Sequence, residues 1–416
     1  MKKRLTYHWM IVLACFLMMA VSIGMGVNCF NLFAVELMAE FNFTAGSVQI
    51  IMMVAVLVSV VGAVLVGKLL AKFPMRPVLT VSAVITIAGF VLYSRCNSLL
   101  TFCLASAVTG IGSAGIGIVP CGSLLNIWFV DKKGLATGIG FSGSVVGGLV
   151  FVQIVNAVIA SSGWRTAYVA LAGIAAVLLL PTTLFIVRAH PNQKGLSPLG
   201  AELAAGQQMK PLGISVSKYI KTGSFWLLAV SAFTISFINI GIQNNISIYF
   251  TKVLGKDMGF AANIFSLVML VQIFGKILLG AIYDKKGIRF GAVYCTVMYL
   301  IAVIAIMWAT NLVIAIVFAV FFGLVSAMNT ITPPYVTARI VGVRDYPTIF
   351  GLLSIFTGIG MAVGPIVAGQ VFDATGSFNG ALYVFMGLAL ILTLIISLAS
   401  KKGEGFSVMD ENSAVT

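Results

Sequence analysis

The chain has 416 residues, of which 60% are hydrophobic and only 9% are charged. Soluble proteins average about 25% charged residues. This composition therefore excludes a single soluble globule, a nucleic-acid-binding protein and a disordered chain, in spite of a net charge of +14. A membrane-spanning helix needs about 20 apolar residues, so a polytopic membrane protein with about 12 to 14 spans is predicted.

Twelve apolar runs follow one another along the chain. They are continuous, which is typical of helices, because the strands of a membrane barrel alternate in hydrophobicity over about ten residues. We therefore predict an all-α membrane protein with twelve transmembrane helices in two pseudo-symmetric six-helix bundles. The expected spans are 9–34, 46–67, 77–95, 100–126, 135–160, 165–187, 224–250, 259–282, 290–309, 312–336, 346–370 and 379–399.

The longest polar gap, Arg188 to Gly223, separates six spans from six spans. It contains three prolines and five basic residues, which is typical of a linker between domains. We expect an N-terminal six-helix bundle (1–187), a cytoplasmic linker (188–223), a C-terminal six-helix bundle (224–400) and a cytoplasmic tail (401–416).

Basic residues predict the orientation of the chain. An even number of spans places both termini on one side of the membrane. The loops and tails on that side carry 20 of the 25 Lys and Arg, and the loops on the other side carry four. Because basic residues gather in cytoplasmic loops, we predict a multi-pass protein of the cell membrane with both termini in the cytoplasm.

An internal repeat relates the two halves. The segment Gly67–Arg76 matches Gly280–Arg289 at an offset of 213 residues. The same offset aligns Pro120 with Pro333, Gly138 with Gly351 and Asn31 with Asn244. Two homologous halves of six spans each, arranged as a parallel repeat, are typical of one class of transporters.

The repeated segment resembles the loop signature of the major facilitator superfamily, G-x-x-x-D-[RK]-x-G-[RK]-[RK]. The second copy is nearly intact, with Gly280, Asp284, Lys285, Gly287 and Arg289. The first copy keeps Gly67, Lys72 and Arg76 but has Ala71 in the place of the acid. The resemblance covers the whole chain and implies a transporter that works by alternating access.

A narrower resemblance is carried by Trp128–Gly138, which is similar to the W-F-x-x-[KR]-[RK]-G-x-A-x-G loop of the monocarboxylate porter and oxalate:formate antiporter families. In both families a basic residue in the eighth span engages a carboxylate. Lys276 takes that position here, where Arg is the more usual occupant.

Lys276 is expected near the middle of the membrane. It lies eight residues before Asp284, which is about 12 Å along a helix, and half of a hydrocarbon core is about 15 Å thick. A Lys at that depth costs about 2.5–3.5 kcal/mol on insertion scales. No Asp or Glu falls within a predicted span, so an anionic substrate is the expected partner. The alternative is a Lys that snorkels to the cytoplasmic interface.

Other polar residues inside spans are candidate substrate contacts. Gln272 lies one helical turn before Lys276; the alternative for it is a hydrogen bond between helices. Proton-coupled porters of the resembled family commonly have an Asp here, so the neutral amide favours exchange or facilitated diffusion over proton symport. The remaining candidates are Asn28 and Asn31, which share a helical face with Gly24, then Asn244, and Thr330, which precedes a bend expected at Pro333-Pro334. The alternative for the amides is that they tie helices together.

The family pattern also implies a cytoplasmic gate. Asp284 would lie at a helix end beside Arg289 and a cation from a neighbouring helix, Arg344. The alternative is a solvated charged loop.

Glycines are frequent in two corresponding spans, the fifth and the eleventh. Their spacing predicts close helix packing; alternatively, they form smooth contacts that permit rocking between halves. They are Gly138, Gly140, Gly143, Gly147, Gly148, Gly358, Gly360, Gly364 and Gly369.

The leading hypothesis is a secondary or facilitative carrier of a small organic anion, in particular a monocarboxylate, that acts as a monomer in the lipid bilayer. A multidrug or proton-coupled exporter of the same superfamily is the alternative, and a polytopic sensor or membrane enzyme is the alternative of another class. The chain has no H-E-x-x-H, no G-x-S-x-G and no P-loop motif. We therefore expect no catalytic residues, no metal, no cofactor and no nucleic-acid partner.

The predicted orientation can be tested by labelling single cysteines in a cysteine-free variant. Ala204→Cys should react only with a reagent on the inside, and Leu254→Cys only with a reagent on the outside, because these positions fall in loops on opposite sides. Reaction from the other side at either position would contradict the topology.

Overall fold

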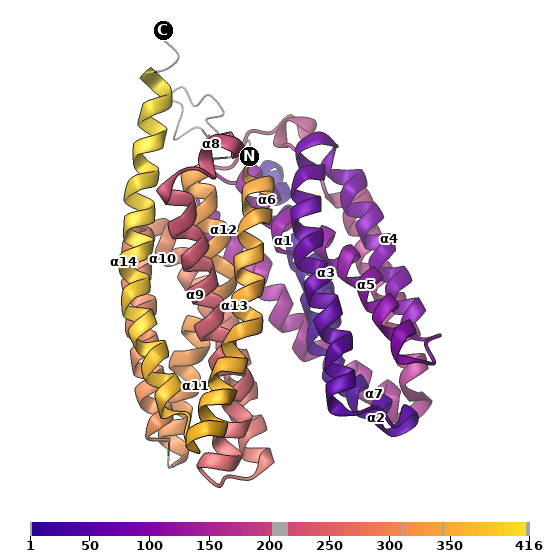
Figure 1. Ribbon diagram of the computed structural model, residues 1–416. Helices are drawn as coiled ribbons and strands as arrows, with labels where there is room; N and C mark the ends of the chain where they lie inside the picture. The colour runs from indigo at the N-terminus through magenta and orange to yellow at the C-terminus, as the bar shows by residue number, and fades with distance from the viewer. Residues whose placement is uncertain (1, 202–214, 310, 343–344, 413–416) are drawn as a thin grey trace. The chain divides into compact units, whose positions relative to one another are not determined.

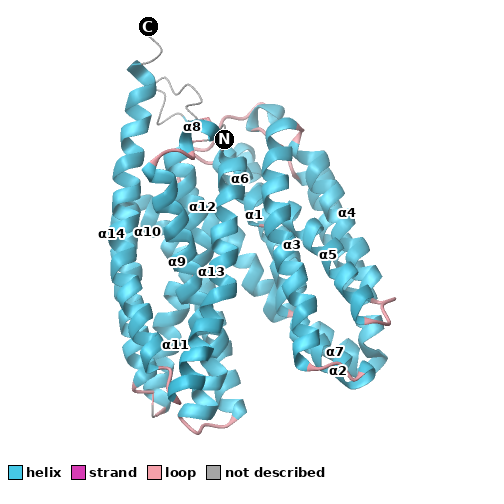
Figure 2. Ribbon diagram, viewed as in Figure 1, coloured by secondary structure: helices cyan, strands magenta, loops and turns pink. Residues whose placement is uncertain are grey.

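The computed structural model describes residues 2–201, 215–309, 311–342 and 345–412. Ala204 and Arg344 lie outside these residues, as does the side chain of Asn31. Throughout the described ranges the regular elements are helices (Figures 1 and 2). The all-α class predicted from the apolar runs is therefore confirmed.

The chain divides into two compact units, and the first comprises Met1–Met209 with Tyr346–Leu352. Its helices follow the first six predicted spans. They are α1 (Lys2–Met19), the π-helical η1 (Ala20–Asn28), α2 (Phe30–Phe41), α3 (Ala45–Lys72), α4 (Met75–Tyr93), α5 (Leu99–Ile116), α6 (Ile118–Trp128), α7 (Lys133–Pro181), the π-helical η2 (Thr182–Ile186) and the short 3-10 helix η3 (Pro191–Lys194).

The second unit comprises Lys210–Asp345 and Leu353–Thr416. Its helices follow the last six predicted spans. They are α8 (Val216–Tyr219), α9 (Gly223–Ile248), the π-helical η5 (Tyr249–Val253), α10 (Met258–Met307), α11 (Leu312–Ser326), α12 (Met328–Val341), α13 (Tyr346–Thr375), whose first residues belong to the other unit, and α14 (Asn379–Asn412).

Ten helical segments of the described chain are long and apolar enough to cross a membrane. Two of them, Lys133–Ile186 and Gly259–Met307, each contain two of the predicted spans. In α7 the division falls at Gly163, with φ +79°, and in α10 at Gly287, with φ +80°. Both glycines adopt a backbone conformation that other residues rarely enter. The ten segments thus correspond to all twelve predicted spans, with limits that differ by a few residues.

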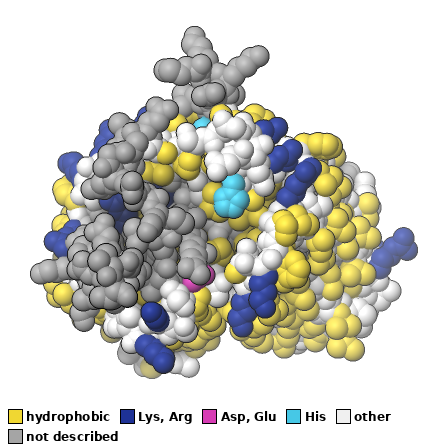
Figure 3. Space-filling view, turned by 90° about the horizontal axis from the view of Figure 1, so that it is seen from above, with side chains coloured by type: hydrophobic (Ala, Val, Ile, Leu, Met, Phe, Trp, Pro, Cys, Tyr) yellow, Lys and Arg dark blue, Asp and Glu magenta, His cyan; other side chains and the backbone are white. Residues whose placement is uncertain are grey.

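The outward faces of these helices are apolar. Val177 on α7 is 72% exposed and Phe274 on α10 is 69% exposed. Apolar surface of this extent is not left in water by monomeric soluble proteins, but it suits lipid chains. Figure 3 looks onto the helix ends, where Lys and Arg side chains far outnumber those of Asp and Glu.

The first span departs from the α-helix on which its predicted polar face depends. Residues 20–28 form a π-helix, and α2 begins only at Phe30. A Cβ at Gly24 would lie 2.8 Å from the backbone of Gly147 and Gly148, so this segment and α7 approach at backbone distance. The i, i+4, i+7 spacing proposed for Gly24, Asn28 and Asn31 therefore does not describe one α-helical face.

The glycines of the fifth and eleventh spans allow close packing within each unit. A Cβ at Gly143 would clash with the carbonyl oxygen of Phe16 on α1. In the second unit a Cβ at Gly364 would clash with the carbonyl oxygen of Phe237 on α9. These contacts confirm the packing interpretation for the two residues.

The tenth predicted span is interrupted at Ala327, and its helix continues through both prolines. Helix α11 ends at Ser326, and α12 continues from Met328 through Pro333 and Pro334. The amide of Thr330 donates to Ala327 O at 3.2 Å, which tightens the turn six residues before the first proline. The two prolines lack N–H groups, so they cannot donate to the carbonyls of Asn329 and Thr330, four residues earlier. The irregular turn at Ala327 lies just before these two carbonyls.

The first part of the predicted linker packs on the first unit. Trp128 Nε1 donates to Arg188 O at 2.9 Å. The amide of Leu199 donates to Trp128 O at 2.9 Å, and the amide of Val130 donates to Leu199 O at 2.9 Å. The Trp128–Gly138 motif therefore has a structural contact that the sequence did not indicate: its first residues hold the chain that follows the sixth span.

A matched pair of glycine substitutions should test the division of α7. Gly163→Ala should lower the free energy of unfolding by about 1–3 kcal/mol, because its φ of +79° is strained for a residue with a Cβ. Gly173→Ala, in the regular part of the same helix with open space around it, should be neutral or stabilising by up to about 1 kcal/mol. Thermal unfolding in detergent measures both, and equal effects would contradict the assignment.

Candidate functional site

Lys276 lies in the first segment of α10 and is 1% exposed. The adjacent Gly275 packs directly against α11, where a Cβ would lie 2.7 Å from Leu324 O. Helix α11 ends two residues later, at Ser326. The buried cation therefore lies at the level where α11 gives way to α12.

Three other candidate contacts belong to the same unit. Gln272, one turn before Lys276 on α10, is half-buried. Thr330, in the first turn of α12, is half-buried and its Oγ1 donates to Ala327 O at 3.4 Å. Asn244 on α9 is exposed, whereas the neighbouring Asn245 is buried and donates to Gly241 O at 2.9 Å and Pro365 O at 3.4 Å.

Asn28 and Asn31 belong to the first unit. The side-chain amide of Asn28 donates to Ser144 O on α7 at 3.3 Å. Its nitrogen also lies against Gly148, which has no side chain to displace it. Asn28 thus ties two helices together, and this hydrogen bond satisfies one of its two amide hydrogens.

Asp284 is held by an aromatic residue of α12. Tyr335 OH donates to Asp284 Oδ1 at 3.2 Å. The ring of Tyr335 stacks on that of Tyr283, with centroids 5.0 Å apart, and Tyr283 OH is 2.6 Å from Thr332 Oγ1. Arg289 is exposed, two residues beyond Gly287. The Asp284 carboxylate therefore links the end of the eighth span to the tenth span.

A polar cluster around the α11–α12 junction was not predicted. Asn239 Nδ2 donates to Tyr299 OH at 2.6 Å and to Ser326 O at 3.2 Å. Ser236 Oγ donates to Asn329 Oδ1 at 2.7 Å. The sequence held one indication of this cluster, because Asn239 lies in an apolar run four residues before the amides at 243–245.

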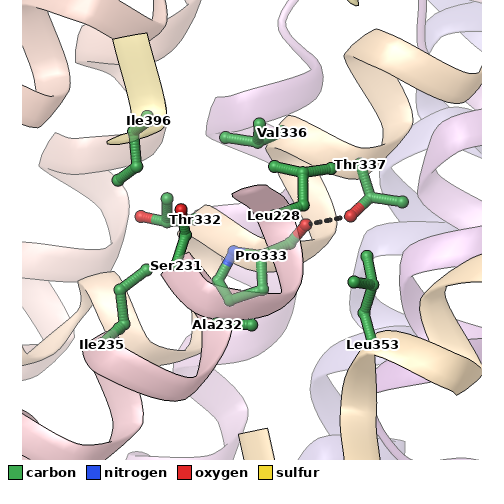
Figure 4. Close-up of a pocket in the computed structure, with 10 residues that line it drawn as sticks. All are labelled: Leu228, Ser231, Ala232, Ile235, Thr332, Pro333, Val336, Thr337, Leu353 and Ile396. Carbon is green, nitrogen blue, oxygen red and sulfur yellow. Dashed lines mark hydrogen bonds between the residues drawn. The ribbon is translucent and has the colours of Figure 1, made fainter. Parts of the chain in front are cut away.

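A small pocket lies between α9 and α12 (Figure 4). Its volume of about 10 Å³ is that of one water position. Pro333 and Ala232 face it from the two helices, and Thr337 Oγ1 beside it donates to Pro333 O at 2.7 Å. This space is too small for a carried solute.

No group of three or more His, Cys, Asp and Glu side chains that could hold a metal ion occurs among the residues that the structure describes. The candidate residues themselves offer the amine of Lys276, the amides of Gln272 and Asn244, the hydroxyl of Thr330 and the carboxylate of Asp284.

Comparison with known proteins gives both family and fold. The family described as Major Facilitator Superfamily matches residues 15–341 and 259–407. Mouse monocarboxylate transporter 12 is 25% identical over 422 residues, which cover 94% of this chain and 84% of the mouse protein. Rat monocarboxylate transporter 4 is 24% identical, with 97% and 84% covered.

Two solved structures share the fold. A proton:xylose symporter bound to 6-bromo-6-deoxy-D-glucose matches with a TM-score of 0.76 at 13% identity, over 94% of this chain and 96% of the symporter. The human organic anion transporter matches with a TM-score of 0.70 at 15% identity, over 94% and 99%.

Substitution of Asp284 should separate conformational exchange from binding. Asp284→Asn should lower turnover while substrate affinity stays within about threefold, a change below 1 kcal/mol, because the carboxylate lies about two helical turns from Lys276. Tyr335→Phe, which removes the donor to Asp284, should change turnover in the same direction by a smaller factor.

Tyr383→Phe on the exposed face of α14 is the matched control and should be neutral. Vesicle uptake gives turnover, and equilibrium binding gives affinity. A large loss of affinity at normal turnover would contradict a gating role for Asp284.

Proposed function

Because the chain belongs to the Major Facilitator Superfamily, we propose that it is a carrier that moves a small organic anion, in particular a monocarboxylate, across the cell membrane by alternating access. Two relatives that align with more than nine-tenths of the chain are named monocarboxylate transporters. The observation that carries the proposal is the nearly complete burial of Lys276 inside a membrane-spanning helix.

A buried ammonium is costly in hydrocarbon, by about 2.5–3.5 kcal/mol on insertion scales. A carboxylate that binds beside it recovers part of that cost through Coulomb attraction and charge-assisted hydrogen bonds. Gln272 and Thr330 offer neutral hydrogen-bonding groups from α10 and α12. Such a set suits one carboxylate with a small polar substituent.

The acidic residues argue against a carrier that relays protons through a membrane carboxylate. Of the eleven Asp and Glu, Asp284 alone falls within the limits of the spans found in the described chain, and it lies three residues before Gly287. Gln272, next to Lys276 on the helix, cannot accept a proton at neutral pH. We therefore propose exchange or facilitated diffusion.

The same proposal includes the arrangement of the chain in the membrane. The excess of basic residues in one set of loops supports cytoplasmic termini and a cytoplasmic linker over 188–223. The proposed bundles are 1–187 and 224–400, and each carrier acts as a monomer.

Substitution of Lys276 tests the proposed function. Lys276→Gln should abolish uptake of labelled lactate, pyruvate and formate into reconstituted vesicles. Lys276→Arg should keep part of it, because Arg retains the charge and changes the shape. Lys218→Gln, at an exposed position on α8, is the matched control and should transport normally. Normal uptake by the Lys276→Gln carrier would end the proposal.

The same vesicles test selectivity for one carboxylate. Oxalate and malonate should compete with a labelled monoanion about a hundredfold more weakly than unlabelled monoanion. The stretch Leu352–Ile359 of α13 contains no basic residue, and a second buried charge costs several kcal/mol without a partner. Dianions that compete equally at neutral pH would refute this selectivity.

A further inference from the structure

The junction between α11 and α12 leaves one backbone carbonyl without its helical donor. In a regular helix the amide of Thr330 would donate to Ser326 O. Here that amide donates to Ala327 O at 3.2 Å, and Asn239 Nδ2 of α9 donates to Ser326 O at 3.2 Å instead. A side chain from another helix therefore replaces the missing bond.

Asn239 is 1% exposed and uses its second amide hydrogen as well. It donates to Tyr299 OH on α10 at 2.6 Å. One side chain thus joins α9, α10 and the end of α11. Ser236, nearly one turn away on α9, donates to Asn329 Oδ1 in the first turn of α12 at 2.7 Å. Both sides of the junction are attached to the same helix.

The first unit contains a related contact. Helix α5 ends at Ile116 and α6 begins at Ile118, with Gly117 between them. Ser22 Oγ, from η1, donates to Ser113 O at 3.1 Å, just before this junction. Ser113 and Ser326 are 213 residues apart, the offset of the internal repeat. The two accepting carbonyls therefore occupy corresponding positions, whereas the helix breaks at Gly117 and Ala327 do not.

Two features weaken the hold on α12: its prolines and the small pocket between it and α9. Pro333 and Pro334 remove two of its internal hydrogen bonds. The pocket beside Pro333 leaves unfilled space on the side of α9 (Figure 4). Ala232 and Ile235 line that pocket and lie on the same face of α9 as Asn239, by helical spacing. This space has the volume of about one water position, so it leaves room for a small displacement at the contact between α9 and α12.

We propose that Asn239 is a positioning residue for transport, which fixes the end of α11 to α9 and α10 while α12 pivots at Ala327 toward the pocket. Ser22 has the corresponding role at the junction of α5 and α6. The inference rests on the proposed function in one respect, that the chain is an alternating-access carrier, and not on which solute it carries.

Turnover and affinity are measured for each folded carrier molecule in vesicles. Asn239→Leu, which has the same number and branching of side-chain heavy atoms but no donor, should lower turnover at least tenfold with substrate affinity within threefold. Asn239→Gln, which keeps the amide, should recover part of the turnover. Asn263→Leu, at an exposed position on α10, is the matched control and should behave as the parent. Normal turnover in Asn239→Leu, or an equal loss of affinity, would overturn the proposal.

Filling the pocket is a second arm. Ala232→Leu should lower turnover at unchanged affinity, whereas Ala262→Leu, exposed on α10, should not. Should Asn239→Leu fail to fold, Tyr299→Phe and Ser22→Ala each remove a single hydroxyl. Lower turnover at unchanged affinity in these two supports the proposal, and normal turnover in both overturns it.

Spin labels separate this inference from the choice of solute. Labels at Val230 on α9 and Arg339 on α12, both exposed, report the distance between the two helices without any substrate. If the parent carries no monocarboxylate, the proposed function fails and this measurement decides the inference alone. A distance distribution altered by Asn239→Leu but not by Asn263→Leu supports it, and identical distributions overturn it.

Discussion

In the hydrocarbon of a bilayer no water is present to bond a free backbone group, so each N–H and C=O must find a partner inside the protein. This constraint makes the chain helical and also decides where it can depart from a regular helix. The carbonyl of Ser326 is bonded by Asn239, and that of Ser113 by Ser22. Where α7 and α10 divide, a glycine adopts positive φ. At each of these four places the sequence supplies what the backbone needs: a side-chain donor for the free carbonyl, or a glycine for the positive φ.

The constraint gives the polar residues of the spans two kinds of role. Asn28, Asn239 and Asn245 donate to backbone carbonyls of other helices or of their own, so they contribute to the packing of their units. Lys276 differs from them in its side-chain amine, which in its charged form can bind a carboxylate. Its burial at the level of the α11–α12 junction places charge and irregular backbone together. Sites of this kind, with interrupted helices in corresponding halves, are where transporters bind their solutes.

The two halves show how a repeat is kept while its residues change. The loop signature retains its acid only in the second half, as Asp284, where Tyr335 donates to it; Ala71 stands in the first half. The fourth and the tenth span are both interrupted, and the corresponding carbonyls of Ser113 and Ser326 accept a hydrogen bond from a serine in one half and from an asparagine in the other. The accepting carbonyls thus correspond in the two halves, whereas the donors and the backbone conformation at the two breaks differ.

The sequence by itself determined the class, the approximate positions of the spans and the family, because hydropathy over some 20 residues is a local property and the signature is a local motif. It also made Lys276 and Asp284 candidates, since a charge in or beside an apolar run stands out. Only the tertiary structure decided which helix lies opposite each polar group. The bond from Tyr335 to Asp284 and the contacts of Asn239 join residues far apart in the chain. The π-helical segment 20–28 and the junction at Ala327 were likewise not predicted. A hydrogen bond between helices has no periodicity within either helix, and its partners are fixed only when the helices pack.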